Sequence, residues 1–114
     1  MITQRVLPIK SFNIIGTYPN KPDDIIDYEV TGEVYCNFGI YQYTNPDIEK
    51  YGMFVCIHIP TGLDVGCFIN RETTIRYAKA ITKADVPTKW DSIDIKELEK
   101  NQNVCNLIYI QVLQ

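Results

Sequence analysis

The chain has few residues of the kinds that form catalytic, cofactor or metal sites. Its 114 residues include one histidine, and its six glycines form neither G-x-G-x-x-G nor G-x-x-x-x-G-K. A nucleotide loop that cradles phosphate groups is therefore not predicted. The four cysteines include no C-x-x-C pair and have no paired histidines, so the usual zinc spacings are missing as well. We expect no cofactor and no metal ion.

Long hydrophobic runs are also missing, and so is an excess of positive charge. No run approaches the roughly 20 apolar residues of a transmembrane helix, and the first residues do not resemble a signal peptide. We therefore expect no membrane association and a cytoplasmic protein. The net charge of −3 disfavours nucleic-acid binding, which usually requires a basic surface.

What the chain does contain is the composition of one folded domain. Apolar residues make up 46% of the sequence and charged residues 22%, which is enough apolar material for a core. The length predicts a single domain, 1–114, because two domains of half that size would each bury too little surface. Four cysteines lie in apolar runs, where we expect reduced thiols packed as small hydrophobic side chains. They are Cys36, Cys56, Cys67 and Cys105.

Residues 53–84 determine the predicted architecture. The apolar runs 53–60 and 63–69 flank a Thr-Gly pair and predict a β-hairpin. Asn70 is a good N-cap for a helix over residues 71–84. The stripe of this helix that faces the sheet comprises Thr74, Ile75, Tyr77, Ala78 and Ile81. The fold class is therefore α+β: one antiparallel or mixed twisted sheet of five to seven strands with the helix packed on one face.

Local patterns assign the remaining elements. Two prolines predict a loop over 18–24, an Asn-Pro pair predicts another over 44–52, and Thr31-Gly32 is expected to form a hairpin turn. A short second helix is expected over 92–100, with Ile95 and Leu98 facing inward. Segment 103–113 is apolar on both faces of an extended chain and is expected to be a central strand. The other predicted strands are 3–7, 11–15, 25–30 and 33–43.

The lone histidine, His58, lies two residues from Cys56, so both side chains are expected on one face of a strand. A thiol beside an imidazole is the minimum of a nucleophilic pair. Side chains at i and i+2 stand about 7 Å apart, which is too far for a direct hydrogen bond. We therefore expect no catalytic residues and no enzyme. An enzymatic interpretation requires Cys56 or Cys67 to be a thiolate of low pKa.

Tyrosine is abundant, and three of the eight tyrosines lie in one predicted strand, 33–43. If that strand is continuous, Tyr35, Tyr41 and Tyr43 share one face with Asn37. The opposite, buried face then holds Val34, Cys36, Phe38 and Ile40. Tyrosine is enriched at protein interfaces, so we predict that a protein partner contacts the tyrosine face. The alternative is that the tyrosines only pack at half-exposed sheet positions.

The predicted helix is basic on its outer face. Arg76, Lys79 and Lys83 recur at i, i+3 and i+7, and Arg71 lies near the helix start. Such a stripe either keeps the helix soluble or, together with sheet tyrosines, binds the phosphates of a nucleic acid or nucleotide. Nucleic-acid binding is therefore the alternative function.

The preferred hypothesis is a small non-enzymatic inhibitor or adaptor that binds a larger protein. Much Ile, Asn, Tyr and Lys against three alanines and three arginines is typical of AT-rich coding sequence, as in many phages and viruses. The hypothesis is therefore an accessory protein of a virus or mobile element that antagonises a host factor. The identity of the partner and the choice between monomer and homodimer stay open.

Overall fold

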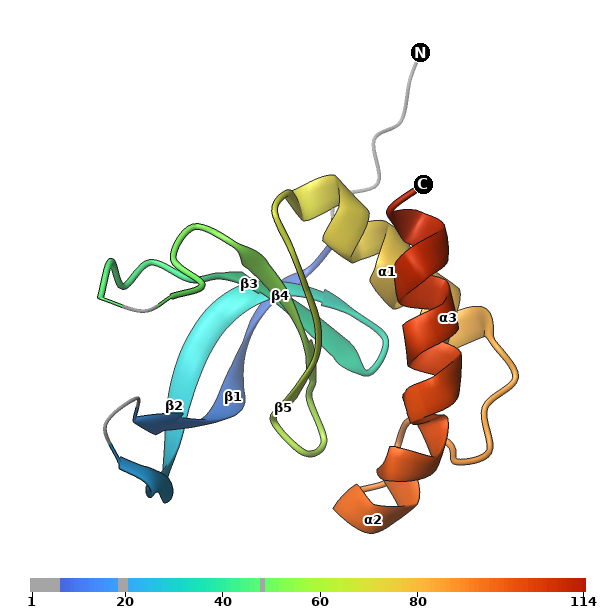
Figure 1. The fold of residues 1–114 in the computed structure, drawn as a ribbon, viewed down its shortest axis with the longest axis horizontal. Coiled ribbons are helices and arrows are strands. Elements are labelled where there is room, and N and C mark those ends of the chain that lie inside the picture. The colour runs from blue at the N-terminus through green and yellow to red at the C-terminus, as the bar shows by residue number, and fades with distance from the viewer. Residues whose placement is uncertain (1–6, 19–20, 48) are drawn as a thin grey trace.

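Five strands follow one another in chain order across one sheet, and the helices pack against one of its faces (Figure 1). The computed structural model describes residues 7–18, 21–47 and 49–114. All neighbouring strands are antiparallel, so the sheet is a meander and the predicted α+β class is confirmed. The strands are β1 (Ile9–Tyr18), β2 (Lys21–Tyr35), β3 (Phe38–Gln42), β4 (Phe54–His58) and β5 (Leu63–Phe68). The helices are α1 (Arg71–Lys83), α2 (Ile95–Leu98), the 3₁₀ helix η1 (Glu99–Asn101) and α3 (Gln102–Val112).

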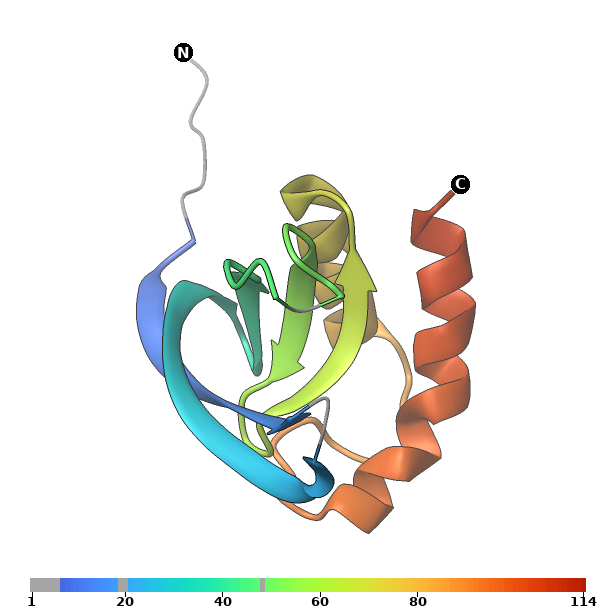
Figure 2. The same ribbon diagram turned by 60° about the vertical axis from the view of Figure 1, so that its left-hand side comes forward.

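The sheet curls strongly, so that its first strand approaches its last (Figure 2). The amide of Ile15 in β1 donates a hydrogen bond to the carbonyl oxygen of Gly62, just before β5, with an N···O distance of 2.9 Å. The Phe12 ring lies so close to Gly39 that a Cβ there would come within 2.4 Å of it. This curl encloses a cluster that we name the inner core. It consists of Phe12, Ile14, Val30, Val34, Val55 and Ile57.

The helix α1 covers the opposite face, as the sequence predicts. The Asn70 side chain accepts a hydrogen bond from the Thr73 amide at 2.8 Å and so caps the helix. Acidic Glu72 in the first turn and basic Lys83 in the last both suit the helix dipole. Between α1, α3 and the sheet lies a second cluster, the helix-side core. Its buried members are Phe38, Ile40, Cys56, Phe68, Tyr77, Ala78, Ile81, Trp90, Cys105 and Ile108.

The second hairpin differs from the prediction. Strand β2 continues through Thr31 and Gly32, and the chain reverses at Cys36 and Asn37 instead. A Cβ on Gly32 would lie 2.1 Å from the Ile40 carbonyl oxygen, so this glycine permits a close strand crossing and not a turn. Cys36 takes the left-handed turn conformation, with φ of 51°.

Two further strand predictions need correction. Of the predicted loop 18–24, Tyr18 belongs to β1 and residues 21–24 belong to β2, while residues 19 and 20 lie outside the described residues. The predicted strand 3–7 lies outside the described residues except for Leu7, which precedes β1. The loop is confirmed for the described residues of 44–52, and so is the hairpin over 53–69.

The segment predicted as a closing strand, 103–113, is the helix α3. Its buried residues Cys105 and Ile108 and the half-buried Tyr109 and Val112 recur at three- and four-residue spacing and face α1 and β5. The predicted helix over 92–100 begins only at Ile95, after the N-cap Asp94, and runs through η1 into α3. Its Leu98 faces inward as expected, but Ile95 is 45% exposed. Within the described ranges, none of these helices is long and apolar enough to cross a membrane.

Candidate functional site

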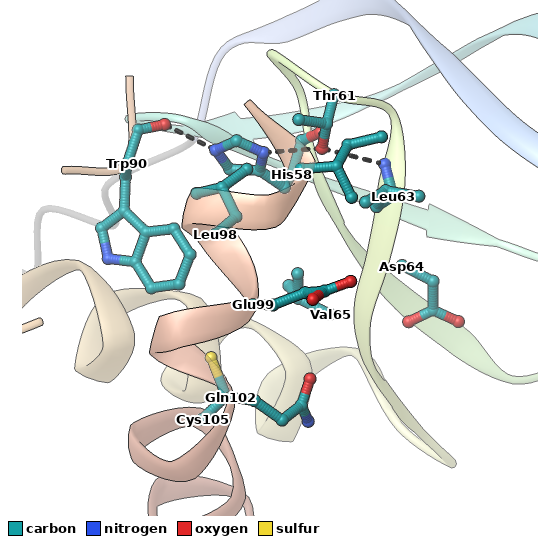
Figure 3. A pocket seen from close by; sticks show the side chains of 11 residues that line it. His58, Thr61, Leu63, Asp64, Val65, Trp90, Leu98, Glu99, Gln102 and Cys105 are labelled. Atoms are coloured by element: carbon teal, nitrogen blue, oxygen red, sulfur yellow. Dashed lines mark hydrogen bonds between the residues drawn. The ribbon is translucent and has the colours of Figure 1, made fainter. Parts of the chain in front are cut away.

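A cavity of about 190 Å³ lies between the β4–β5 turn and the start of α3 (Figure 3). Apolar side chains from three segments line it, among them Leu63, Val65, Trp90 and Leu98. The turn that forms its rim depends on Gly62, whose φ of 75° is in the left-handed region. Ligand sites for drug-sized molecules usually exceed about 300 Å³, so this cavity suits only a small group.

His58 borders the cavity but has both ring nitrogens engaged. Its Nδ1 lies 2.8 Å from the Thr61 hydroxyl, and its Nε2 faces the Trp90 carbonyl oxygen. A carbonyl only accepts, so Nε2 carries the proton and Nδ1 accepts from Thr61. Burial lowers the pKa of His58 below its ordinary value, and the Trp90 carbonyl opposes this in part. The neutral ring thus has a structural role: its hydrogen bonds connect β4 to the segment before α2.

The cysteine next to it is no better placed for catalysis. Cys56 and His58 both lie on the helix side of β4, as predicted, but Cys56 is completely buried. Burial raises the pKa of its thiol well above the ordinary value, and burial raises that of Cys67 too. These environments disfavour the thiolate on which a nucleophilic role depends. All four cysteines lie in the described residues and are free.

The two acidic residues that line the cavity, Asp64 and Glu99, come from different elements, β5 and η1. Asp64 accepts hydrogen bonds from the Lys50 ammonium at 3.2 Å and the Gly66 amide at 2.9 Å, and Figure 3 shows its carboxylate directed away from His58. Glu99 and Gln102 border the cavity from the helical side. Among the residues that the structure describes, no three His, Cys, Asp or Glu side chains come together as metal ligands would.

The structure separates the tyrosines that the sequence predicts on one face. Because the chain reverses at Cys36 and Asn37, Tyr35 pairs with Phe38 and shares its face, the helix side. There the Lys79 ammonium lies 5.7 Å from the centre of the Tyr35 ring. Asn37 is a turn residue. The prediction that Tyr35, Tyr41 and Tyr43 share one face was wrong. The alternation of side chains between the two faces was applied to residues 33–43 as a single strand, whereas a turn divides them.

Tyr41 and Tyr43 lie on the other face with Tyr28, and we name these three residues the tyrosine end. The Tyr41 and Tyr43 rings pack edge to face, with centroids 5.8 Å apart, against the inner core. Burial, and then the neighbouring Tyr41, raise the pKa of Tyr28; burial, and then Asp64, raise that of Tyr43. Tyr28 is 37% exposed, and Tyr41 and Tyr43 are half-buried. The tyrosine end thus closes the inner core while leaving aromatic edges in solvent.

The basic residues of α1 contact other parts of the protein. Arg71 forms a two-point ion pair with Glu33 of β2, and Arg76 donates to the Val112 carbonyl oxygen at the end of α3 at 3.0 Å. Lys79 stacks on Tyr35 as described above, and Lys83 is exposed in the last turn. These contacts give three of the four cations a structural role.

One surface was missed by the sequence interpretation. On its outer face α3 exposes Leu107 by 63%, Ile110 by 56% and Leu113 by 58%, and we name these residues the α3 stripe. Ile69, 80% exposed, lines the same shallow depression as Leu113. The sequence signal was present, since apolar residues at 107, 110 and 113 follow a helical repeat, but the segment was interpreted as a buried strand.

The chain was compared with protein-family models, with curated proteins and with solved structures, and none matches.

Proposed function

We propose that the protein is a non-enzymatic inhibitor or adaptor that binds a larger protein through the tyrosine end. The observation that carries this proposal is the packing of Tyr41 against Tyr43 over the inner core. Aromatic side chains already held in place lose little conformational freedom on binding, and half-exposed tyrosines offer both apolar area and a hydroxyl group. Such residues are typical anchors of protein interfaces.

The net charge of −3 favours a basic surface on the partner. An acidic protein of this size can block a basic cleft that otherwise receives nucleic acid, and opposite charge speeds the encounter. The amino-acid composition supports an accessory role in a virus or mobile element that antagonises a host factor. Direct nucleic-acid binding is less well supported, because Arg71, Arg76 and Lys79 already contact Glu33, Val112 and Tyr35.

The test is affinity capture from a lysate of the native host, with and without nuclease, followed by mass spectrometry. We expect to recover one stoichiometric protein partner, and its binding should survive nuclease treatment. Tyr41→Ala should weaken the affinity for this partner by at least about 30-fold, as is typical of a hot-spot residue. Tyr35→Ala is the matched control, since it removes a tyrosine from the opposite face and should retain the partner.

Urea unfolding must show that both variants are folded. If Tyr41→Ala proves too unstable, Tyr41→Phe keeps the packing and removes only the hydroxyl, and a weaker loss of affinity is expected. Equal retention of the partner by wild type, Tyr41→Ala and Tyr35→Ala would contradict the proposal. Release of everything captured by nuclease would favour the nucleic-acid alternative.

A further inference from the structure

The α3 stripe is a surface that folding does not explain. Cys105 and Ile108 bury the inner side of α3 against the helix-side core, so the helix is already held by one face. A helix with a covered apolar side normally turns polar side chains to solvent. Leu107, Ile110 and Leu113 do the opposite, and large exposed apolar side chains that lie together mark interaction surfaces.

The stripe lies in a segment without charge. Residues 102–114 contain no Asp, Glu, Lys, Arg or His, although the chain as a whole carries 25 charged residues of the first four kinds. The polar residues of α3 that flank the stripe are amides, among them Asn103 and Asn106. Each amide both donates and accepts hydrogen bonds, so such a surface can pair with a copy of itself. Surfaces that select a different protein usually rely on complementary charge around their rim.

We infer that the α3 stripe is the contact between two copies of this chain, packed with their α3 helices antiparallel about a two-fold axis. Two molecules of net charge −3 repel each other, and α3 brings no charged side chain of its own into the contact. The cation nearest to it is Arg76 of α1, which lines the depression with Ile69 and Leu113 at the edge of the contact. Asn103, Leu107 and Ile110 recur at four- and three-residue spacing, which places them along one seam.

The contact between two α3 helices is short. An 11-residue helix is about 16 Å long, so two α3 helices with Ile69 at the edge form an interface at the small end of the usual range. We therefore expect a dissociation constant in the micromolar range. The dimer is independent of the proposed partner binding, because the β3–β4 loop that follows Tyr43 lies on the side of the molecule away from α3 (Figure 1).

Sedimentation equilibrium and light scattering of the purified protein, from a few micromolar to a few hundred micromolar, test the inference. We expect the mass to rise from 13.2 kDa toward twice that value with concentration. Leu107→Glu should keep the protein monomeric throughout, because it places two carboxylates in the seam. Ile93→Glu makes the same change at an isoleucine that is 78% exposed outside the stripe, and it should dimerise as wild type does.

Salt provides a second readout. An interface without charge between acidic molecules should be unchanged or slightly stronger at high ionic strength, whereas one built on ion pairs weakens. A wild-type protein that stays monomeric across the range overturns the inference, and so does a dimer that Leu107→Glu leaves intact. A monomer that loses its captured partner with Leu107→Glu assigns the stripe to a different protein and also overturns self-association.

Discussion

The imidazole of His58 illustrates how a residue that suggests chemistry can serve structure. It is 1% exposed and connects Thr61 in the β4–β5 turn to the Trp90 carbonyl. In the neutral ring, Nδ1 accepts a hydrogen bond from the Thr61 hydroxyl, and protonation of Nδ1 would remove this acceptor. The neutral ring is therefore the form that the folded protein accommodates.

This gives a pH dependence of stability with a definite sign. The folded pKa lies below the ordinary value of 6.5, so below about pH 6.5 the unfolded chain binds a proton that the folded protein does not. The free energy of unfolding should fall as the pH drops from 6.5 toward the folded pKa, by at most about 1.4 kcal/mol per pH unit. Urea unfolding at several pH values measures it. In His58→Gln the carboxylates still titrate, so only the part of the slope due to His58 should disappear; an unchanged slope would contradict the assignment.

A second residue-scale prediction concerns the turn at Cys36. Its φ of 51° costs a residue with a Cβ about 1 kcal/mol, and the side chain is exposed, so little packing depends on it. Cys36→Gly should therefore raise the free energy of unfolding by about 0.5–1 kcal/mol. Gly62→Ala is the converse control, since it adds a Cβ at a φ of 75° and should destabilise. A thermal melt distinguishes the two directions.

Among the elements, the segment between α1 and α3 depends on hydrogen bonds made by side chains. Asn101 holds it: the side chain is 1% exposed, its Oδ1 accepts from the Thr88 amide at 3.0 Å and its Nδ2 donates to the Thr88 carbonyl at 2.8 Å. Asn101→Ala removes both bonds and should cost about 2–3 kcal/mol in urea unfolding. Gln111→Ala, at an exposed amide of α3 outside the stripe, should stay within about 0.5 kcal/mol. Similar losses in both variants would show that the bridge to Thr88 contributes little.

Prediction from sequence succeeded where an element's signals are local. Asn70 and the spacing of Thr74, Ala78 and Ile81 specify α1, and the Thr-Gly pair between two apolar runs specifies the β4–β5 hairpin. The prediction failed at Gly32, because its role depends on contacts with Phe12 and Ile40, which lie far away in the sequence. It failed at 103–113 because an apolar stripe on the outside of a helix makes the segment look buried on every side.

The candidate site residues were also predictable only where the signal is local. Three- and four-residue spacing predicts Arg76, Lys79 and Lys83 on the outer face of α1, where Arg76 and Lys83 are exposed and Lys79 is half-buried. The contacts of Arg76 and Lys79 could not be predicted, since Val112 and Tyr35 come from other elements. For the tyrosines, a turn shifted by five residues, from Thr31-Gly32 to Cys36-Asn37, was enough to move Tyr35 to the opposite face from Tyr41.

At the scale of the whole molecule, the curled sheet organises two cores, one inside its curl and one beneath the helices. The tyrosine end closes the first, and α3 completes the second. The two proposed contact surfaces are thus the outer sides of the elements that complete each core, and they face different directions.

The meander also has a consequence for how the chain folds. Each strand pairs with the strand before it, so every ladder closes over a short stretch of chain, and none of the four pairings waits for a distant segment. Local pairing lowers the entropy lost in the transition state and is typical of fast-folding domains. The contact between Ile15 and Gly62 is different, because it joins residues 47 positions apart and needs the strands β1 to β4 in place. The sheet can therefore assemble strand by strand in chain order, with the curl forming as a late step.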